Sequence, residues 1–229
     1  MLTVYRFRIK DSNAAKQLDR MARAVNFVWN FCNQTQLHAV KWNMKWPTGY
    51  DLNKLTAGVS KELGIQSQTV NAICEEYATR RLYACKTKLR WRSKRSLGWI
   101  PFKASGIRRK GNVFTYYGVR LPVWDTWSID MNLVHVKCGS LAEDARGRWY
   151  LNLTCEMPDL KPSKATSAIG VDLGLKTLAT ASDGTQIASK RFYRDLEADL
   201  AGAQRANKKG RAKTIHAKIA NRRKDFLHK

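Results

Sequence analysis

The N-terminal part of the chain shows two different spacings of apolar residues. Residues 3–9 alternate polar and apolar side chains, which predicts a β-strand with Val4, Phe7 and Ile9 available to a core. From about Asn13 the apolar residues recur at helical spacing, which predicts a long helix whose buried stripe includes Leu18, Met21, Val25, Val28 and Cys32. Aromatic residues, Pro47 and Gly49 interrupt this pattern over residues 42–49, so we expect a break there.

A second helix is predicted over residues 67–92, because Val70, Ile73 and Tyr77 share one face and basic residues lie on the other. Ser67 and Gln68 provide an acceptable cap at its start. From residue 99 to residue 157 the pattern changes to short β-rich runs separated by turns with Gly or Pro, at residues 112–117, 133–136 and 149–155. We expect a β domain that pairs with the first strand and leaves the helices as an insertion.

The remaining residues predict a linker, a small sheet and a basic helical segment. Residues 158–166 are rich in Pro, Lys and Ser and indicate the linker. A meander of three strands follows, in which the first suits a central strand, over residues 168–171, 178–181 and 185–187. Asp183 and Gly184 are a strong hairpin signal, because glycine tolerates a positive φ. Residues 192–229 are helical in pattern and basic.

The chain is strongly basic. It contains 42 Lys and Arg residues but only 18 Asp and Glu residues, which gives a formal net charge of +24. Such an excess favours a polyanionic partner. Between Tyr77 and Trp124 there is no acidic residue, and the run holds Arg80, Arg81, Lys86, Lys88, Arg90, Arg92, Lys94, Arg95, Lys103, Arg108, Arg109, Lys110 and Arg120. Aromatic residues are interleaved with these cations, among them Trp91, Trp99 and Phe102. The mixture fits phosphate neutralisation and base stacking on RNA or opened DNA; alternatively, the aromatic residues form a core.

Asp172 is the carboxylate in the apolar run that opens the meander. Burying it is costly unless it meets a metal or a firm hydrogen-bond partner, and the alternative is a polar residue at a strand end. The arrangement resembles the opening of ribonuclease-H-like nucleases, in which such a carboxylate helps to hold two magnesium ions. It equally resembles the opening of the actin and sugar-kinase ATPases, which do not need so basic a surface.

Length and cysteine usage set broader bounds. The 229 residues can bury one substantial core or two modest ones. The five cysteines are odd in number and scattered, which argues against a disulfide framework and against a compact zinc site. The N-terminus lacks the apolar stretch of a signal peptide, no run reaches membrane-spanning length and the cysteine usage fits a reducing cytosol, so we expect a cytoplasmic protein.

The order of these parts, with Gly98-Trp99-Ile100-Pro101-Phe102-Lys103 in the β domain and Ile169-Gly170-Val171-Asp172-Leu173-Gly174 in the meander, resembles the TnpB family. These insertion-sequence proteins are RNA-guided DNA endonucleases related to miniature type V CRISPR effectors. The resemblance implies a multi-domain α+β fold: a β-barrel-like wedge domain, an inserted helical recognition domain and the start of a ribonuclease-H-like (RuvC) domain. The implied boundaries are 1–10 and 98–160 for the wedge domain, 11–97 for the helical domain and 161–229 for the incomplete nuclease domain with a basic helical insertion.

The resemblance also assigns roles to residues. Asp172 takes the place of the first catalytic, metal-binding carboxylate, with Mg²⁺ as the expected ion at a complete site. The segment 67–71 and the stretch 102–104 take the place of the elements that read a short motif adjacent to the DNA target, with Ser67, Gln68, Asn71, Phe102 and Lys103 as candidate contacts. A capping role for Ser67 and Gln68 is the alternative. The candidates for RNA or DNA backbone binding are Arg80, Arg81, Lys86, Lys88, Arg90, Arg92, Lys94, Arg95, Arg108, Arg109 and Lys110.

The family's later Glu, its later Asp and its paired Cys-x-x-Cys zinc motif lie beyond Lys229. Glu197 and Asp199 fall in a helical segment and are expected to be solvated surface charges. One carboxylate cannot hold two metal ions, so we expect this chain to bind a guide RNA and double-stranded target DNA without cutting DNA alone. Two functions follow: part of an RNA-guided DNA endonuclease, or a nuclease-inactive relative that binds guide RNA and DNA as a repressor or remnant.

Overall fold

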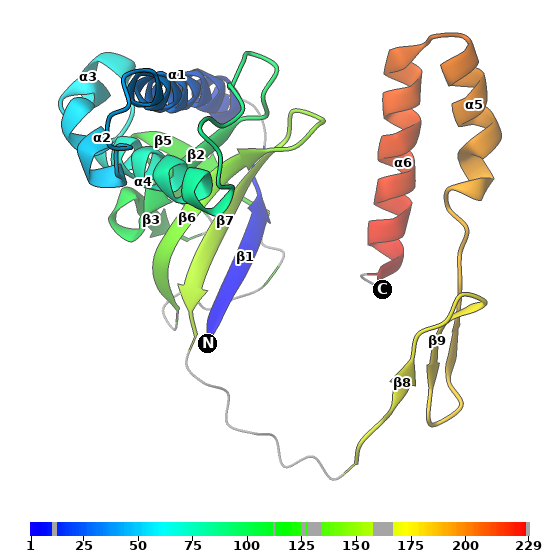
Figure 1. The fold of residues 1–229 in the computed structure, drawn as a ribbon. Coiled ribbons are helices and arrows are strands. Elements are labelled where there is room, and N and C mark those ends of the chain that lie inside the picture. The colour runs from blue at the N-terminus through cyan, green and yellow to red at the C-terminus, as the bar shows by residue number, and fades with distance from the viewer. Residues whose placement is uncertain (11–12, 112, 125–126, 128–133, 158–166, 228–229) are drawn as a thin grey trace. The chain divides into compact units, whose positions relative to one another are not determined.

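A computed structural model describes residues 1–10, 13–111, 113–124, 127, 134–157 and 167–227. The chain divides into two compact units, Met1–Leu160 and Lys161–Lys229, which we treat separately (Figure 1). The predicted linker at residues 158–166 lies outside the described residues. None of the described helices is long and apolar enough to cross a membrane.

The first unit combines four helices with two antiparallel sheets. Its helices are α1 (Asn13–Lys41), α2 (Gly49–Leu55), α3 (Val59–Leu63) and α4 (Ser67–Tyr83). One sheet has the strand order β1-β7-β6-β2, with β1 (Leu2–Arg8), β7 (Trp149–Glu156), β6 (His135–Glu143) and β2 (Trp99–Lys103). The other has the order β3-β4-β5, with β3 (Ile107–Lys110), β4 (Val113–Tyr116) and β5 (Val119–Pro122).

The predicted pairing of the first strand with the β domain is confirmed, since β1 runs antiparallel to β7 with Phe7 opposite Leu151. The chain after β1 continues this linkage, because Lys10 N donates to Pro122 O at 2.7 Å and Trp124 N donates to Arg8 O at 2.9 Å. The two sheets are thereby joined by the chain that leads into α1. The helices form an insertion between β1 and β2.

One core connects the helices to both sheets. The predicted stripe of α1, from Leu18 to Cys32, is buried. Trp29 of α1 lies edge-on to Tyr77 of α4 and to Trp99 of β2, with ring centroids 5.2 and 6.2 Å apart. Aromatic burial of this kind contributes a large share of the stabilising apolar area.

The structure differs from the sequence-based expectation at α4. This helix ends at Tyr83, nine positions before the predicted Arg92 (92 − 83), and Cys85 has a left-handed φ of 49°. The cap prediction is also wrong, because Ser67 is already helical and Gln66 occupies the N-cap without a side-chain hydrogen bond. The residues after α4 do not continue the helix because side chains of α1 form hydrogen bonds with their backbone.

The second unit holds a small sheet and a helical hairpin. The sheet order is β10-β9-β8, with β8 (Val171–Asp172), β9 (Thr177–Ala181) and β10 (Gln186–Ala188). The predicted turn is confirmed, as Gly184 has a φ of 87° and its N–H donates to Ala181 O at 3.0 Å. The 3-10 turn η3 (Arg194–Leu196), α5 (Glu197–Arg205) and α6 (Lys209–Leu227) follow, and α5 packs on α6 through Leu196, Leu200, Ala203, Ile215 and Ile219.

Candidate nucleic-acid interface

Side-chain amides on α1 hold the chain that follows α4 in an extended form. Asn33 accepts from Leu89 N at 3.0 Å and donates to Leu89 O at 2.9 Å. Asn30 makes the same pair of hydrogen bonds with Arg92. Its Oδ1 accepts from Arg92 N at 2.9 Å and its Nδ2 donates to Arg92 O at 2.8 Å. Each amide thus satisfies both backbone groups of one residue, as a neighbouring strand would.

Further donors on the same face of α1 fix the residues between and beyond these anchors. Trp29 Nε1 donates to Arg90 O at 3.1 Å, and Asn26 Nδ2 donates to Ser93 O at 3.3 Å. Each such bond contributes about 0.5–1.5 kcal/mol net. We call residues 86–95 the strap. The strap cannot continue α4, because its backbone groups are bonded to α1 instead.

The strap displays a set of unpaired cations. Side chains that are exposed and have no carboxylate within ion-pair distance in the described structure are Lys86, Lys88, Arg90, Lys94 and Arg95. Cations without an internal partner remain available to phosphates. These five predicted backbone-binding residues therefore lie where an anionic ligand can reach them.

Arg92 lies on the strap but has a different surrounding. It is half-buried, its Nε donates to Asn26 Oδ1, and its Nη2 donates to Leu97 O at 2.8 Å. Its guanidinium also lies 5.7 Å from the centroid of the Trp99 ring. Burial lowers the pKa of Arg92, and the charge of Arg80 lowers it further. Arg92 therefore holds the strap in place.

The two neighbouring arginines of α4 have different surroundings. Arg81 is buried with 6% of its surface exposed, and it donates to Gln36 Oε1. Burial lowers the pKa of its guanidinium. The prediction that Arg81 contacts a nucleic-acid backbone is wrong, because this side chain lies on the buried face of α4. Arg80 is exposed and pairs with Glu76 at 2.5 Å.

A second group of exposed cations lies on β3. Arg108, Arg109 and Lys110 are exposed. Arg109 Nε donates to Gly111 O at 2.7 Å and its guanidinium lies 5.7 Å from the Phe114 ring centroid, so its position is partly fixed. The sheet that carries these residues packs its other side into the core through Phe114 and Tyr116.

The predicted motif-reading residues separate into four places, of which one is the groove that holds Lys103. Ser67 and Asn71 line a cavity of about 350 Å³ with Asn53, whose side-chain oxygen is buried without a hydrogen-bond partner in the described structure. Gln68 instead accepts from Ser105 Oγ at 2.8 Å. Phe102 is 1% exposed and packs 5.6 Å from Tyr116, so the prediction that it contacts DNA is wrong: strand alternation turns it into the core.

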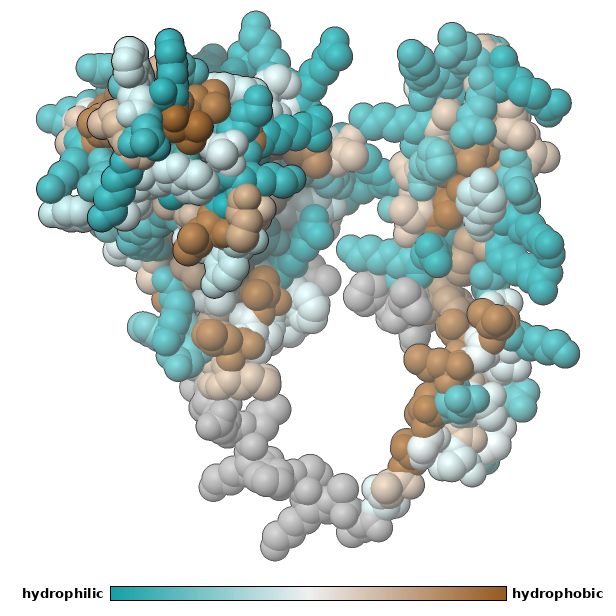
Figure 2. Space-filling model, in the orientation of Figure 1, coloured by the Kyte–Doolittle hydropathy of each residue, from teal (hydrophilic) through white to brown (hydrophobic). Residues whose placement is uncertain are grey.

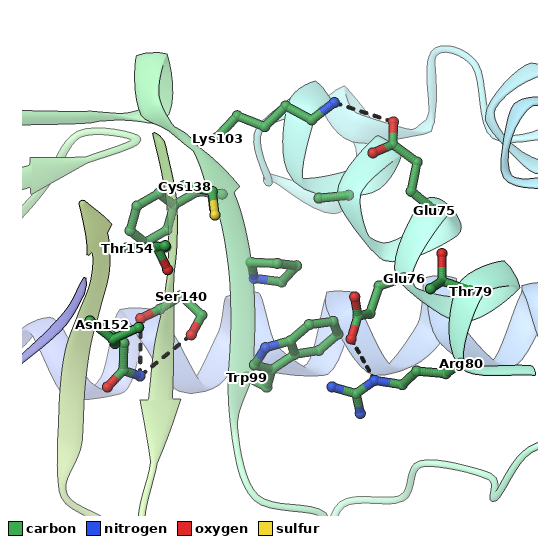
Figure 3. A pocket seen from close by; sticks show the side chains of 15 residues that line it. Glu75, Glu76, Thr79, Arg80, Trp99, Lys103, Cys138, Ser140, Asn152 and Thr154 are labelled. Atoms are coloured by element: carbon green, nitrogen blue, oxygen red, sulfur yellow. Dashed lines mark hydrogen bonds and ion pairs between the residues drawn. The ribbon is translucent and has the colours of Figure 1, made fainter. Parts of the chain in front are cut away.

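Lys103 lies at the mouth of a groove between α4 and the four-stranded sheet (Figure 3). The groove has a volume of about 540 Å³. Lys103 Nζ contacts Glu75 at 3.2 Å, which ties β2 to α4 through a half-exposed ion pair. Deeper in the groove, Asn152 Nδ2 donates to Ser140 O at 3.4 Å and Trp99 forms part of the lining. A DNA contact by Lys103 would have to displace Glu75.

Asp172 is exposed at the end of β8, at the edge of its sheet opposite Thr180. The prediction of a buried central strand is therefore wrong, and the desolvation argument for a metal partner does not apply here. Large apolar neighbours are exposed as well, among them Val171 at 59% and Leu175 at 98%. Hydrophobic side chains, drawn in brown, are visible at the surface over the β8–β9 segment in Figure 2. The described residues contain no group of three or more His, Cys, Asp or Glu side chains able to hold a metal ion.

The α5–α6 hairpin carries its charges outward. Glu197 and Asp199 are exposed in the first turn of α5, as expected, where carboxylates interact favourably with the helix dipole. The cations of α6 and of the turn before it are exposed too: Lys208, Lys209, Arg211, Arg222, Arg223 and Lys224.

Comparisons with known proteins find relatives of part of this basic chain. Residues 152–229 match the OrfB_IS605 family, described as a probable transposase. A Streptomyces pristinaespiralis protein named "Putative RNA-guided DNA endonuclease" is 39% identical over 102 residues, which cover 39% of this chain and 25% of that protein. Over the matched residues, the chain is similar to this transposase family and to this protein.

Two further matches accompany these similarities. The Escherichia coli (strain K12) protein named "Putative RNA-guided DNA endonuclease InsQ" is 31% identical over 96 residues, covering 36% of this chain and 24% of that protein. The chain thus spans about a quarter of the length of these curated relatives. A Cas12f1–sgRNA–target DNA complex solved by cryo-EM aligns with 99% of this chain and 67% of the other at 12% identity and a TM-score of 0.39.

Sequence reasoning missed the amide face of α1. Asn26, Asn30 and Asn33 recur at helical spacing next to the apolar stripe, and that spacing was the available signal. Polar residues on the buried side of a helix need partners, so they indicate a second chain segment packed there.

Proposed function

We propose that this chain is part of a TnpB-family protein and binds guide RNA and target DNA as part of an RNA-guided DNA endonuclease. The observation that carries the proposal is the strap, on which cations are displayed on an anchored backbone without internal partners. The names of the curated relatives support the same activity class. Cations condensed on the nucleic-acid phosphates would be replaced by the side chains of Lys86, Lys88, Arg90, Lys94 and Arg95.

Recognition of a short target-adjacent motif in double-stranded DNA is the second part of the proposal. Ser67 and Asn71 offer a hydroxyl and an amide at the cavity they share with Asn53, and base edges bind to such groups. Gln68 and Lys103 would join them by exchanging their present partners, Ser105 and Glu75.

Magnesium is the ion expected for phosphodiester hydrolysis, and Asp172 can supply one hard oxygen ligand. The residues described here do not fit a two-metal site, because no further carboxylate joins Asp172. We therefore derive no cutting step from this structure.

The salt dependence of RNA binding tests the proposal. Lys88→Glu with Lys94→Glu should weaken RNA binding and flatten the slope of log affinity against log salt by roughly 0.7–0.9 for each phosphate that the variant no longer neutralises. Arg92 is left intact, because its replacement would release the strap. Lys61→Glu on α3 is the matched control, since Lys61 is equally exposed and lies outside the strap.

An unchanged slope in the strap variant, or an equal change in Lys61→Glu, would contradict the proposal. Sequencing RNA that copurifies with the chain separates guided binding from general polyanion binding. A guide that derives from a transposon end is the expected result.

A further inference from the structure

Trp91 occupies an unusual place on the strap. It lies between Leu89 and Arg92, whose backbone groups are both held by α1, and it follows Arg90, whose carbonyl accepts from Trp29. Its backbone position is therefore fixed from both sides. Its side chain is nevertheless 43% exposed.

The indole of Trp91 has no aromatic or cationic partner among the described residues, whereas other tryptophans do. Trp99 packs against Trp29, Trp46 lies 5.2 Å from the guanidinium of Arg81, and Trp42 lies 5.5 Å from the ammonium of Lys41. Trp91 therefore combines a backbone fixed by its neighbours with an indole that is partly open to solvent.

The neighbours of Trp91 suggest what it contacts. Arg90 precedes it and Lys94 follows within three positions, and both are exposed. Successive bases of a single strand stack on aromatic faces while nearby cations follow the backbone. A backbone ordered before binding also reduces the entropy lost on association.

We propose that Trp91 stacks on an unpaired nucleobase of a single strand whose phosphates contact Arg90 and Lys94. Asn30 is a positioning residue in this arrangement, because it holds the backbone of Arg92 next to Trp91. The inference rests on the proposed function and adds the type of ligand: an unpaired base, from RNA or from opened DNA. A paired duplex base offers no free face for this contact.

Binding of short labelled oligonucleotides tests the role of Trp91. Trp91→Ala should weaken binding of a single-stranded RNA about 5- to 100-fold, from the usual effect of losing one stacked base. Trp91→Phe should retain most of the affinity, and the slope of log affinity against log salt should stay unchanged because no charge is removed. Binding of a duplex of the same sequence should be unaffected. A single-stranded DNA arm assigns the base to RNA or DNA by which strand loses more affinity.

Trp42→Ala is the matched control, since Trp42 is 61% exposed and adjoins a lysine but lies at the end of α1. Unchanged single-strand binding in Trp91→Ala, or an equal loss in Trp42→Ala, overturns the inference. Salt-dependent RNA binding that persists unchanged in Trp91→Ala leaves the proposed function standing. Absence of binding by the unaltered chain to every nucleic acid overturns both.

A double-mutant cycle tests Asn30. Asn30→Ala should weaken single-strand binding more in the unaltered chain than in the Trp91→Ala background, because only the unaltered chain also loses the placement of the indole. Equal losses in both backgrounds would show that Asn30 does not act through Trp91 and would overturn its role in positioning that residue.

Discussion

The Tyr77 hydroxyl donates to Oδ1 of Asn33 at 2.8 Å, and it thereby links α4 to the amide that holds the strap. Tyr77→Phe should lower the free energy of unfolding by about 0.5–1.5 kcal/mol, since one buried hydrogen bond is removed while Asn33 Oδ1 keeps Leu89 N as a donor. Chemical denaturation measures the change. Tyr83→Phe, at an 84% exposed position on the same helix, should leave stability unaltered.

The same tyrosine predicts a loss of stability in alkali. Burial raises the pKa of Tyr77 from 10.0 to about 12. A raised folded-state pKa means that the stabilisation is complete below pH 10 and is lost as the pH rises from 10 towards 12. The difference in stability between the unaltered chain and Tyr77→Phe should shrink over this range; a constant difference would contradict the assignment.

The burial of single basic residues could not be predicted from the sequence. The acid-free stretch predicts a cationic surface, and most of its basic residues are exposed. Arg81 and Arg92 are exceptions, because the former faces Gln36 and the latter Asn26. Sequence pattern does not distinguish them from Arg90 or Arg95, since their burial depends on amides far away in the chain.

Within the elements, two glycines should respond in opposite directions to an added methyl group. A Cβ at Gly139 on β6 would lie 2.4 Å from Asn152 O and 2.6 Å from the Phe102 ring, and both atoms are held by the sheet. Gly139→Ala should therefore destabilise the chain by about 1–3 kcal/mol. Gly202 lies inside α5 with nothing within 4 Å of its Cβ position, so Gly202→Ala should stabilise the hairpin by about 0.5–1 kcal/mol. Thermal unfolding followed by circular dichroism checks both signs.

The elements show where local pattern and long-range contacts disagree. Apolar spacing predicts α1 and the strands β1, β7 and β9 near their observed bounds. It predicts α4 too long, because residues 84–92 contain no proline or glycine to end it. The end of α4 is set by hydrogen bonds from Asn30 and Asn33, and an interaction over such a separation leaves no local signal.

For the whole molecule, the isolated carboxylate of Asp172 determines the expected chemistry. Magnesium keeps much of its water unless several oxygen ligands converge, and the described residues bring none to Asp172. This chain should show no guided cleavage of DNA with magnesium, and Asp172→Asn should leave RNA affinity within about twofold, because the residue is a single exposed acid. A gel assay on labelled target DNA checks the first statement and a binding titration the second.

Cleavage that depends on magnesium and on the guide, and that survives in Asp172→Asn, would contradict two statements. These are the assignment of Asp172 as a metal ligand and the expectation that this chain lacks enough oxygen ligands to cut DNA. In a protein that brings a Glu and an Asp to Asp172, the same substitution should abolish cutting, since two metal ions would lose a shared ligand. The sequence pattern places Asp172 at its strand, as the structure does. It does not reveal the exposure of that strand, because burial depends on what packs against the sheet.

The ion pair between Lys103 and Glu75 has a consequence for the ionic atmosphere of the molecule. Glu75 already balances the charge of Lys103, so a phosphate that reaches this lysine meets little net positive charge to take the place of its condensed counterions. Contact at this position should therefore be almost neutral in counterion exchange, whereas each contact on the strap releases a cation. The two surfaces of one protein would differ in this respect, so raising the salt concentration should detach nucleic acid from the strap before it detaches it from the groove.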